Sequence, residues 1–205
     1  MTDKAKASRE KILLNEESFS YLFFEGSSSQ NPIIFFHATG LNAATYLNLL
    51  TKIFEDFDGE RSIYAFDQRG HGLSLAEADH TKLKSWKQFS KEAISFLNSL
   101  DHESVDLMGH SMGGIVASEV ASQLKLKVQN LIMLEPVLYY APKDVIKLKL
   151  KNFLKFDDLS ASNKSSSAKQ RRNNFASFEE AIEHFTGRAM SVSYTHLRAH
   201  ETHND

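Results

Sequence analysis

One serine of this chain lies in a pattern that could make it a nucleophile. Residues 109–113, GHSMG, have the form G-x-S-x-G, between an apolar, strand-like run at 105–108 and a helical spacing over 112–124. A serine on a sharp strand-to-helix turn holds its Oγ clear of the sheet, and only small flanking residues let the strand and helix approach. The pattern predicts that Ser111 attacks an electrophilic carbonyl. The alternative is an inert serine in a glycine-rich turn.

A second feature could supply the hydrogen bonds that such an attack needs. The residues HATG at 37–40 directly follow the apolar run at 33–36, and a loop there can aim a backbone N–H at a developing oxyanion. The second donor would be the N–H of Met112, the residue after the nucleophile. Because both donors are backbone groups, the side chains at Thr39 and Met112 matter little.

The neighbouring histidines have a structural interpretation and a metal-binding one. We interpret His37 as a residue that pins its loop through a ring hydrogen bond. On residue count alone, His37, His71 and His110 could form a metal site. No acidic ligand accompanies them at helical spacing, so we predict no metal.

A third stretch, FDQRGHGLS at 66–74, runs from a strand end into a glycine-punctuated loop. Asp67 and Arg69 could pair and brace this loop against the other two. An aspartate before a glycine-rich turn more commonly accepts hydrogen bonds from backbone N–H groups. We therefore expect a structural role for this stretch.

The composition excludes several classes of protein. The chain has 205 residues, with 24 Lys and Arg against 26 Asp and Glu, so it lacks the basic excess of sequence-independent nucleic-acid binders. It has no cysteine, which rules out disulfides and thiolate sites. No apolar run approaches the length of a membrane helix, and the charged N-terminus does not resemble a signal peptide. We predict a cytoplasmic protein with no membrane or nucleic-acid partner.

Strand and helix patterns alternate along the chain. We expect one or two strands within 11–25, and further strands at 33–36, 62–66, 105–108 and 131–134; helices are expected at 42–57, 86–100 and 112–124. This alternation predicts an α/β fold with a mostly parallel sheet and right-handed crossovers. The continuous apolar runs, including 131–134, predict strands that are buried on both faces.

Taken together, HATG, DQRGHGLS and GHSMGG, in that order, resemble the α/β-hydrolase superfamily, in its serine hydrolase branch with a helical cap. The resemblance covers residues 11–140. It implies a mostly parallel sheet flanked by helices, a nucleophile at Ser111 and an oxyanion hole from the N–H groups of Thr39 and Met112. Ala38 stays open as the alternative to Thr39, because His-Gly is commoner than His-Ala in the family. No cofactor is implied.

The remaining segments have different characters. Residues 1–10 are predicted to be a flexible terminus, and 141–190 the start of the cap. Within the cap we expect a basic amphipathic helix at 143–156, which we interpret as a solvated helix face; the alternative is a membrane-surface or calmodulin-type element. A second cap helix is expected to begin at a capping box, Ser177 to Glu180. Residues 191–205 resemble a translated sequencing adapter, so we expect a non-native tail.

The resemblance also implies an acid and a histidine after Ser111, beyond the two final strands of the fold. The sequence shows no pattern for those two strands, so we expect a C-terminally truncated and inactive chain. Glu135 is a weak candidate for the acid and His184 for the base. The predicted reaction of the parent protein is cleavage of an ester, thioester or related acyl bond in a small apolar substrate. The alternatives are carbon–carbon bond hydrolysis on the same fold and ligand binding without turnover.

Overall fold

The computed structural model describes residues 7–79, 85–137, 176–177 and 180 of the chain. The chain divides into two units, Met1–Val137 and Leu138–Asp205. The fold described below belongs to the first unit.

Most of the predicted cap lies outside the described residues, as do the tail at 191–205 and His184. In the second unit, the N–H of Glu180 donates to Ser177 Oγ at 3.2 Å, as predicted for a capping serine. The carboxylate of Glu180 accepts from the N–H of Ala176 at 2.6 Å, one residue before the expected partner.

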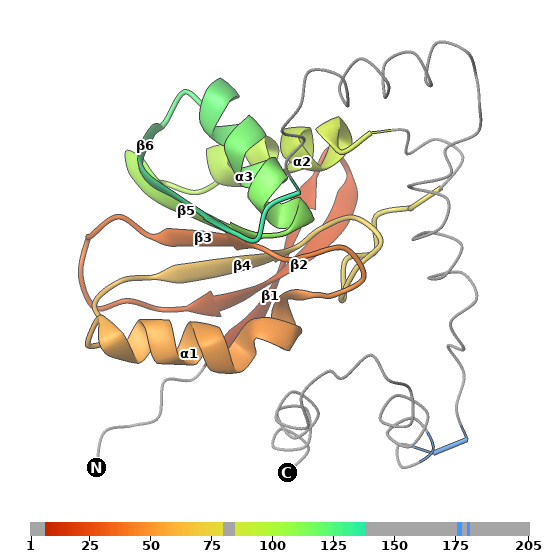
Figure 1. Ribbon diagram of the computed structural model, residues 1–205, viewed down its shortest axis with the longest axis horizontal. Coiled ribbons are helices and arrows are strands. Elements are labelled where there is room, and N and C mark those ends of the chain that lie inside the picture. The colour runs from red at the N-terminus through yellow and green to blue at the C-terminus, as the bar shows by residue number, and fades with distance from the viewer. Residues whose placement is uncertain (1–6, 80–84, 138–175, 178–179, 181–205) are drawn as a thin grey trace. The chain divides into compact units, whose positions relative to one another are not determined.

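The first unit is built on a six-stranded sheet with the order β1-β2-β4-β3-β5-β6. The strands are β1 (Ser8–Leu14), β2 (Glu17–Phe24), β3 (Ile33–Phe36), β4 (Ile63–Asp67), β5 (Ser104–His110) and β6 (Lys127–Leu134). β1 and β2 form an antiparallel hairpin, β2 is antiparallel to β4, and β4, β3, β5 and β6 run parallel. The predicted α/β fold with a mostly parallel sheet is confirmed (Figure 1).

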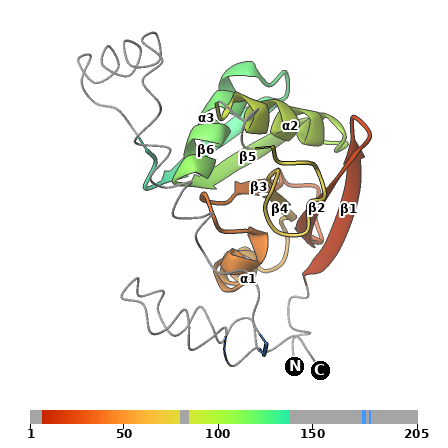
Figure 2. The ribbon, with the colours of Figure 1, turned by 90° about the vertical axis from the view of Figure 1, so that its right-hand side faces the viewer.

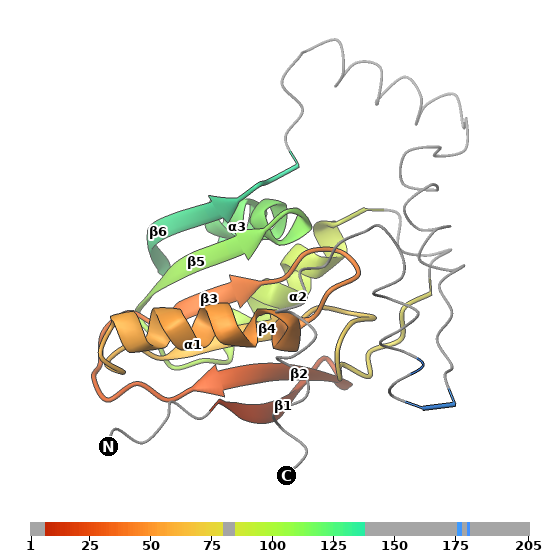
Figure 3. The same cartoon turned by 60° about the horizontal axis from the view of Figure 1, so that its bottom comes forward.

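Helices cover both faces of this sheet. The short 3-10 helix η1 (Ala43–Tyr46) leads directly into α1 (Leu47–Asp56), which packs on one face. Helices α2 (Lys87–Asn98) and α3 (Met112–Gln123) lie on the other face (Figures 2 and 3). None of the described helices is long and apolar enough to cross a membrane.

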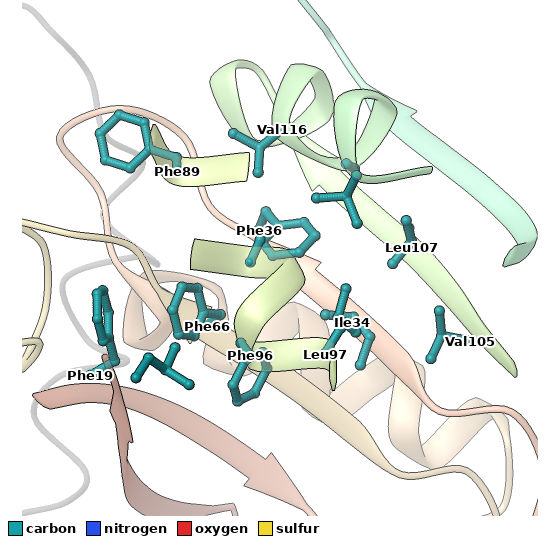
Figure 4. Packing of buried hydrophobic residues seen from close by; sticks show 14 of the residues in the cluster. Phe19, Ile34, Phe36, Phe66, Phe89, Phe96, Leu97, Val105, Leu107 and Val116 are labelled. Atoms are coloured by element: carbon teal, nitrogen blue, oxygen red, sulfur yellow. The ribbon is translucent and has the colours of Figure 1, made fainter. Parts of the chain in front are cut away.

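Aromatic side chains fill the layer between the sheet and helices α2 and α3 (Figure 4). Phe36, Phe66 and Phe96 are all buried there, and the rings of Phe66 and Phe96 stack with centroids 4.7 Å apart. On the other face, Leu50 of α1 packs against a second cluster that includes Phe35. Each such side chain stabilises the fold by roughly 1.5–3 kcal/mol, so the core holds the strand ends that carry the site in place.

Two predictions about the sheet are wrong in detail. β1 begins at Ser8, so residues 8–10 are not a flexible terminus: their backbone pairs with β2, and Arg9 forms an ion pair with Asp67 at 2.5 Å. β6 has the predicted apolar sequence, yet Ile132 is 42% exposed. Within the part of the chain that the structure describes, β6 pairs only with β5, so it has no strand on its outer side to bury it.

Candidate active site

The three motifs meet at one edge of the sheet. His37 follows β3, Gln68 follows β4, Ser111 follows β5 and Glu135 follows β6. These strands are parallel, so their carboxyl ends lie at the same edge, where ligands bind in open α/β sheets.

Ser111 forms the turn between β5 and α3, as predicted. Its backbone has φ 52° and ψ −114°, a left-handed conformation that is unfavourable for a residue with a Cβ. The N–H of Ser111 donates to the carbonyl of Leu134 on β6 at 2.8 Å, which helps to hold the turn. The residue is partly exposed, and within the described residues its Oγ has no hydrogen bond.

Two glycines allow this turn to form. A Cβ on Gly109 would lie 2.2 Å from the carbonyl oxygen of Gly113. A Cβ on Gly113 would lie 2.1 Å from the carbonyl oxygen of Phe36, at the end of β3. Both contacts involve backbone atoms, which cannot swing away. The glycines of G-x-S-x-G are thus required because strand and helix approach each other so closely.

In the loop after β3, the backbone N–H groups of residues 38–41 differ in whether they have an acceptor. The N–H of Ala38 donates to Tyr46 Oη at 3.2 Å, that of Gly40 to His71 Nε2 at 3.1 Å and that of Leu41 to the Ala38 carbonyl at 3.2 Å. Among the residues that the structure describes, the N–H of Thr39 has no acceptor. Of the two candidate donors in this loop, Ala38 is thus occupied and Thr39 is free.

A side-chain contact brings Thr39 next to the turn at Ser111. Thr39 Oγ1 donates to the sulfur of Met112 at 3.1 Å. Met112 is the first residue of α3, so its N–H has no acceptor within its own helix. Within the described residues, the N–H groups of Thr39 and Met112 thus have no acceptor, and the contact between the two side chains brings these residues together.

His37 is buried and pins the loop through both ring nitrogens, as predicted. Nδ1 donates to the Ala38 carbonyl at 2.9 Å, and Nε2 accepts from the N–H of Gln68 at 3.0 Å. Burial, with a smaller contribution from the neighbouring His71, lowers the pKa of His37 to about 4, so the ring is neutral at pH 7. His71 Nε2 likewise accepts a backbone N–H, from Gly40. Neither Nε2 has a lone pair left for a metal, and the described residues contain no metal-binding cluster.

This burial predicts a pH effect on stability. The pKa of His37 is about 4 in the folded protein, against 6.5 for an exposed histidine, so the unfolded chain takes up the proton first as the pH falls. Stability should therefore rise with pH between about 4 and 6.5, and His37 should account for about 3 kcal/mol of the change. Urea unfolding at several pH values should show a shallower dependence for His37→Gln than for the wild type.

The variant His102→Gln is a control for this prediction. Burial also lowers the pKa of His102, but the residue is only partly buried. Its replacement should change the pH dependence of stability less. Identical slopes for His37→Gln and the wild type would contradict the assignment of a neutral His37.

The loop after β4 is braced differently from the predicted Asp67–Arg69 pair. Asp67 is buried, pairs with Arg9 and accepts from the N–H of Ala43 at 2.8 Å. Arg69 pairs instead with Glu17 on β2 and with Glu92 on α2. Asp67 and Arg69 therefore do not form the pair considered as a possibility, because their side chains contact different elements. The expected role of Asp67 as an acceptor of backbone N–H groups is confirmed.

Three further side chains approach the site. Tyr46 Oη lies 2.7 Å from His110 Nδ1, and His110 Nε2 lies 4.0 Å from a carboxylate oxygen of Glu135. The side chain of Glu135 is 92% exposed, and its backbone has φ 44°. Sequence reasoning weighed Glu135 but did not identify Tyr46, because the helical pattern of 42–57 gives no sign that its ring turns toward the loop.

A comparison with protein families identifies the family of this chain. The sequence model of the family described as serine aminopeptidase, S33, matches residues 27–194. The match covers well over half of the chain, so the chain belongs to this family of α/β hydrolases. The superfamily indicated by the three motifs is confirmed.

Each individual relative matches only part of this chain, and the matched segment is a still smaller share of the relative's own length. The 1-acylglycerol-3-phosphate O-acyltransferase ABHD5 of Rattus norvegicus is 28% identical over 121 residues, 58% of this chain and 33% of that protein. The protein phosphatase methylesterase 1 of Saccharomyces cerevisiae is 29% identical over 119 residues, 51% of this chain and 30% of that protein. The chain thus spans about a third of the length of these curated relatives.

Solved structures match the fold over more of the chain. The thioesterase domain from the curacin biosynthetic pathway has a TM-score of 0.67 at 18% identity, over 94% of this chain and 65% of that one. The hypothetical protein PA1622 from Pseudomonas aeruginosa PAO1 also has a TM-score of 0.67, at 22% identity, over 93% of this chain and 63% of that one. At these identities the similarity concerns the fold.

Proposed function

We propose that the protein containing this chain is a serine hydrolase that cleaves an ester, thioester or related acyl bond. The observation that carries the proposal is that Ser111, a partly exposed residue whose hydroxyl has no hydrogen bond within the described residues, precedes Met112, which contacts Thr39. The N–H groups of Thr39 and Met112 also have no acceptor there, so they are available to stabilise a carbonyl oxygen that becomes negatively charged.

The proposed reaction begins with attack by Ser111 Oγ on the carbonyl carbon, while a base removes the hydroxyl proton. The carbonyl oxygen becomes an oxyanion that accepts hydrogen bonds from the N–H groups of Thr39 and Met112. Collapse of this intermediate breaks the bond to the leaving group, which takes the proton from the base. Water then hydrolyses the acyl-serine by the same steps.

The base for this reaction is not among the described residues that contact Ser111. Of the two histidines beside the turn, His37 uses both ring nitrogens in the loop. His110 binds Tyr46 through Nδ1 and has Nε2 nearest to Glu135. We therefore assign neither of them as the base. We propose that the base and the acid lie outside the described residues.

The names of the relatives support acyl chemistry. A methylesterase, an acyltransferase and a thioesterase domain are among the proteins that resemble this chain. Each of these names describes breaking or transfer of an acyl bond. We propose a small apolar acyl substrate, in keeping with the phenylalanine-rich sequence, and a cytoplasmic location, in keeping with the absence of cysteine. No metal or cofactor takes part in the proposed steps.

A fluorophosphonate probe tests the proposal. Such probes form a covalent bond only with an activated serine, so the protein expressed from the complete reading frame should be labelled. Peptide mass spectrometry should place the label on Ser111. A label on another serine would contradict the proposed nucleophile, and a folded protein that is not labelled would favour a ligand-binding function instead.

A further inference from the structure

The hydroxyl of Tyr46 joins the two segments that carry the proposed oxyanion donors. It accepts the N–H of Ala38 at 3.2 Å and lies 2.7 Å from His110 Nδ1. Ala38 directly precedes Thr39, and His110 directly precedes Ser111. One oxygen atom therefore connects the loop after β3 to the end of β5.

The Tyr46 hydroxyl can make both hydrogen bonds at once. Its oxygen accepts from the N–H of Ala38, and its own proton can be donated to His110 Nδ1 in the tautomer of His110 that carries its proton on Nε2. Nε2 is the ring nitrogen nearest to the Glu135 carboxylate. Burial raises the pKa of Tyr46, so the hydroxyl keeps its proton and remains a donor at pH 7.

The ring of Tyr46 is held from two sides. It packs on Phe35 of β3 with centroids 4.6 Å apart, and on His110 edge-to-face at 5.8 Å. The residue ends η1, whose start is fixed by the Asn42 side chain, which accepts the N–H of Thr45. The hydroxyl is therefore carried on a rigid support rather than on a mobile side chain.

We propose that Tyr46 is a positioning residue for the oxyanion hole, an inference that rests on the proposed function. Its hydroxyl occupies the N–H of Ala38, so Thr39 presents the free amide of the loop. It also fixes the distance from that loop to the turn at Ser111. Small errors in such positions reduce the rate of the chemical step more than they reduce substrate binding.

The variant Tyr46→Phe tests this role, because it keeps the ring packing and removes only the hydroxyl. With a p-nitrophenyl ester and the protein from the complete reading frame, kcat should fall about 10- to 100-fold. KM should stay unchanged. The affinity for a phenylboronic acid, whose adduct with serine mimics the tetrahedral intermediate, should fall with kcat.

Tyr64→Phe is the matched control. Tyr64 Oη lies 3.1 Å from His102 Nε2, so this variant also removes a tyrosine–histidine hydrogen bond. His102 precedes β5, at the edge of the sheet opposite to Ser111. Tyr64→Phe should leave kcat and boronate affinity at the wild-type values. Melting temperatures by circular dichroism should show that both variants are folded.

Two outcomes would overturn the proposal while leaving the proposed function intact. One is a Tyr46→Phe protein that labels at Ser111 and has the wild-type kcat. The other is an equal loss of kcat in Tyr46→Phe and Tyr64→Phe, which would indicate a general effect on stability. Failure of the proposed function would be recognised separately, by labelling that does not depend on Ser111.

Discussion

Ser111→Ala is expected to lower kcat/KM for an activated ester by about 10⁴-fold or more. The substitution removes the proposed attacking oxygen and leaves the two proposed amide donors, Thr39 and Met112, in place. It should not unfold the protein, because alanine has the same Cβ as serine and no described hydrogen bond is lost. The residual rate should reflect binding and the oxyanion donors alone. Steady-state hydrolysis of a p-nitrophenyl ester by the protein from the complete reading frame measures the effect.

Ser122→Ala is the control for this substitution. Ser122 lies on α3, the helix that Ser111 begins, but it is exposed and donates only to the Glu119 carbonyl. Its replacement should leave kcat/KM unchanged. If Ser111→Ala kept more than a tenth of the wild-type rate, another group would have to be the nucleophile. In that case the proposed function would be wrong, even though the fold and the family would stand.

Much of the fold can be predicted because its signals are local. The apolar run at β3 predicts a buried strand from its own residues, and the spacing of Val116 and Val120 predicts the buried side of α3. The two edge strands of the sheet are harder to predict, because their ends and their burial depend on residues that are distant in the sequence. Arg9 looks like part of a polar terminus until Asp67, 58 residues away, is placed beside it. The apolar sequence of β6 predicts burial, but burial also requires a neighbouring strand.

The candidate site likewise contains features that local sequence predicts and contacts between distant residues that it does not. The turn at Ser111 follows from the glycine spacing, and the structural role of His37 follows from its place after a buried strand. The partners of Arg69 could not be predicted, since Glu17 and Glu92 lie 52 and 23 residues away in the sequence. Tyr46 is a similar case: its contact with His110 spans 64 residues and depends on how η1 leaves the loop.

Gly113→Ala is expected to destabilise the fold strongly, by about 3 kcal/mol. The new Cβ would meet the Phe36 carbonyl carbon at 2.6 Å and the His37 carbonyl oxygen at 2.7 Å, in addition to the Phe36 oxygen at 2.1 Å. These atoms belong to β3 and to the loop that carries Thr39. Relief of the clash must move α3 away from β3, so the two proposed amide donors should also separate. Activity should fall together with the free energy of unfolding.

Gly114→Ala, one residue further along α3, separates this clash from the effect of alanine in a helix. A Cβ there would lie 3.3 Å from the Gly109 carbonyl oxygen and from Pro136 Cβ, which requires only small shifts. Alanine also favours a helix over glycine by about 1 kcal/mol, so Gly114→Ala should be close to the wild type in stability. Urea unfolding, followed by the fluorescence of the single tryptophan, compares the two variants. Equal stabilities would show that α3 does not approach β3 closely, and the turn at Ser111 would then lack the strained geometry on which the proposed nucleophile depends.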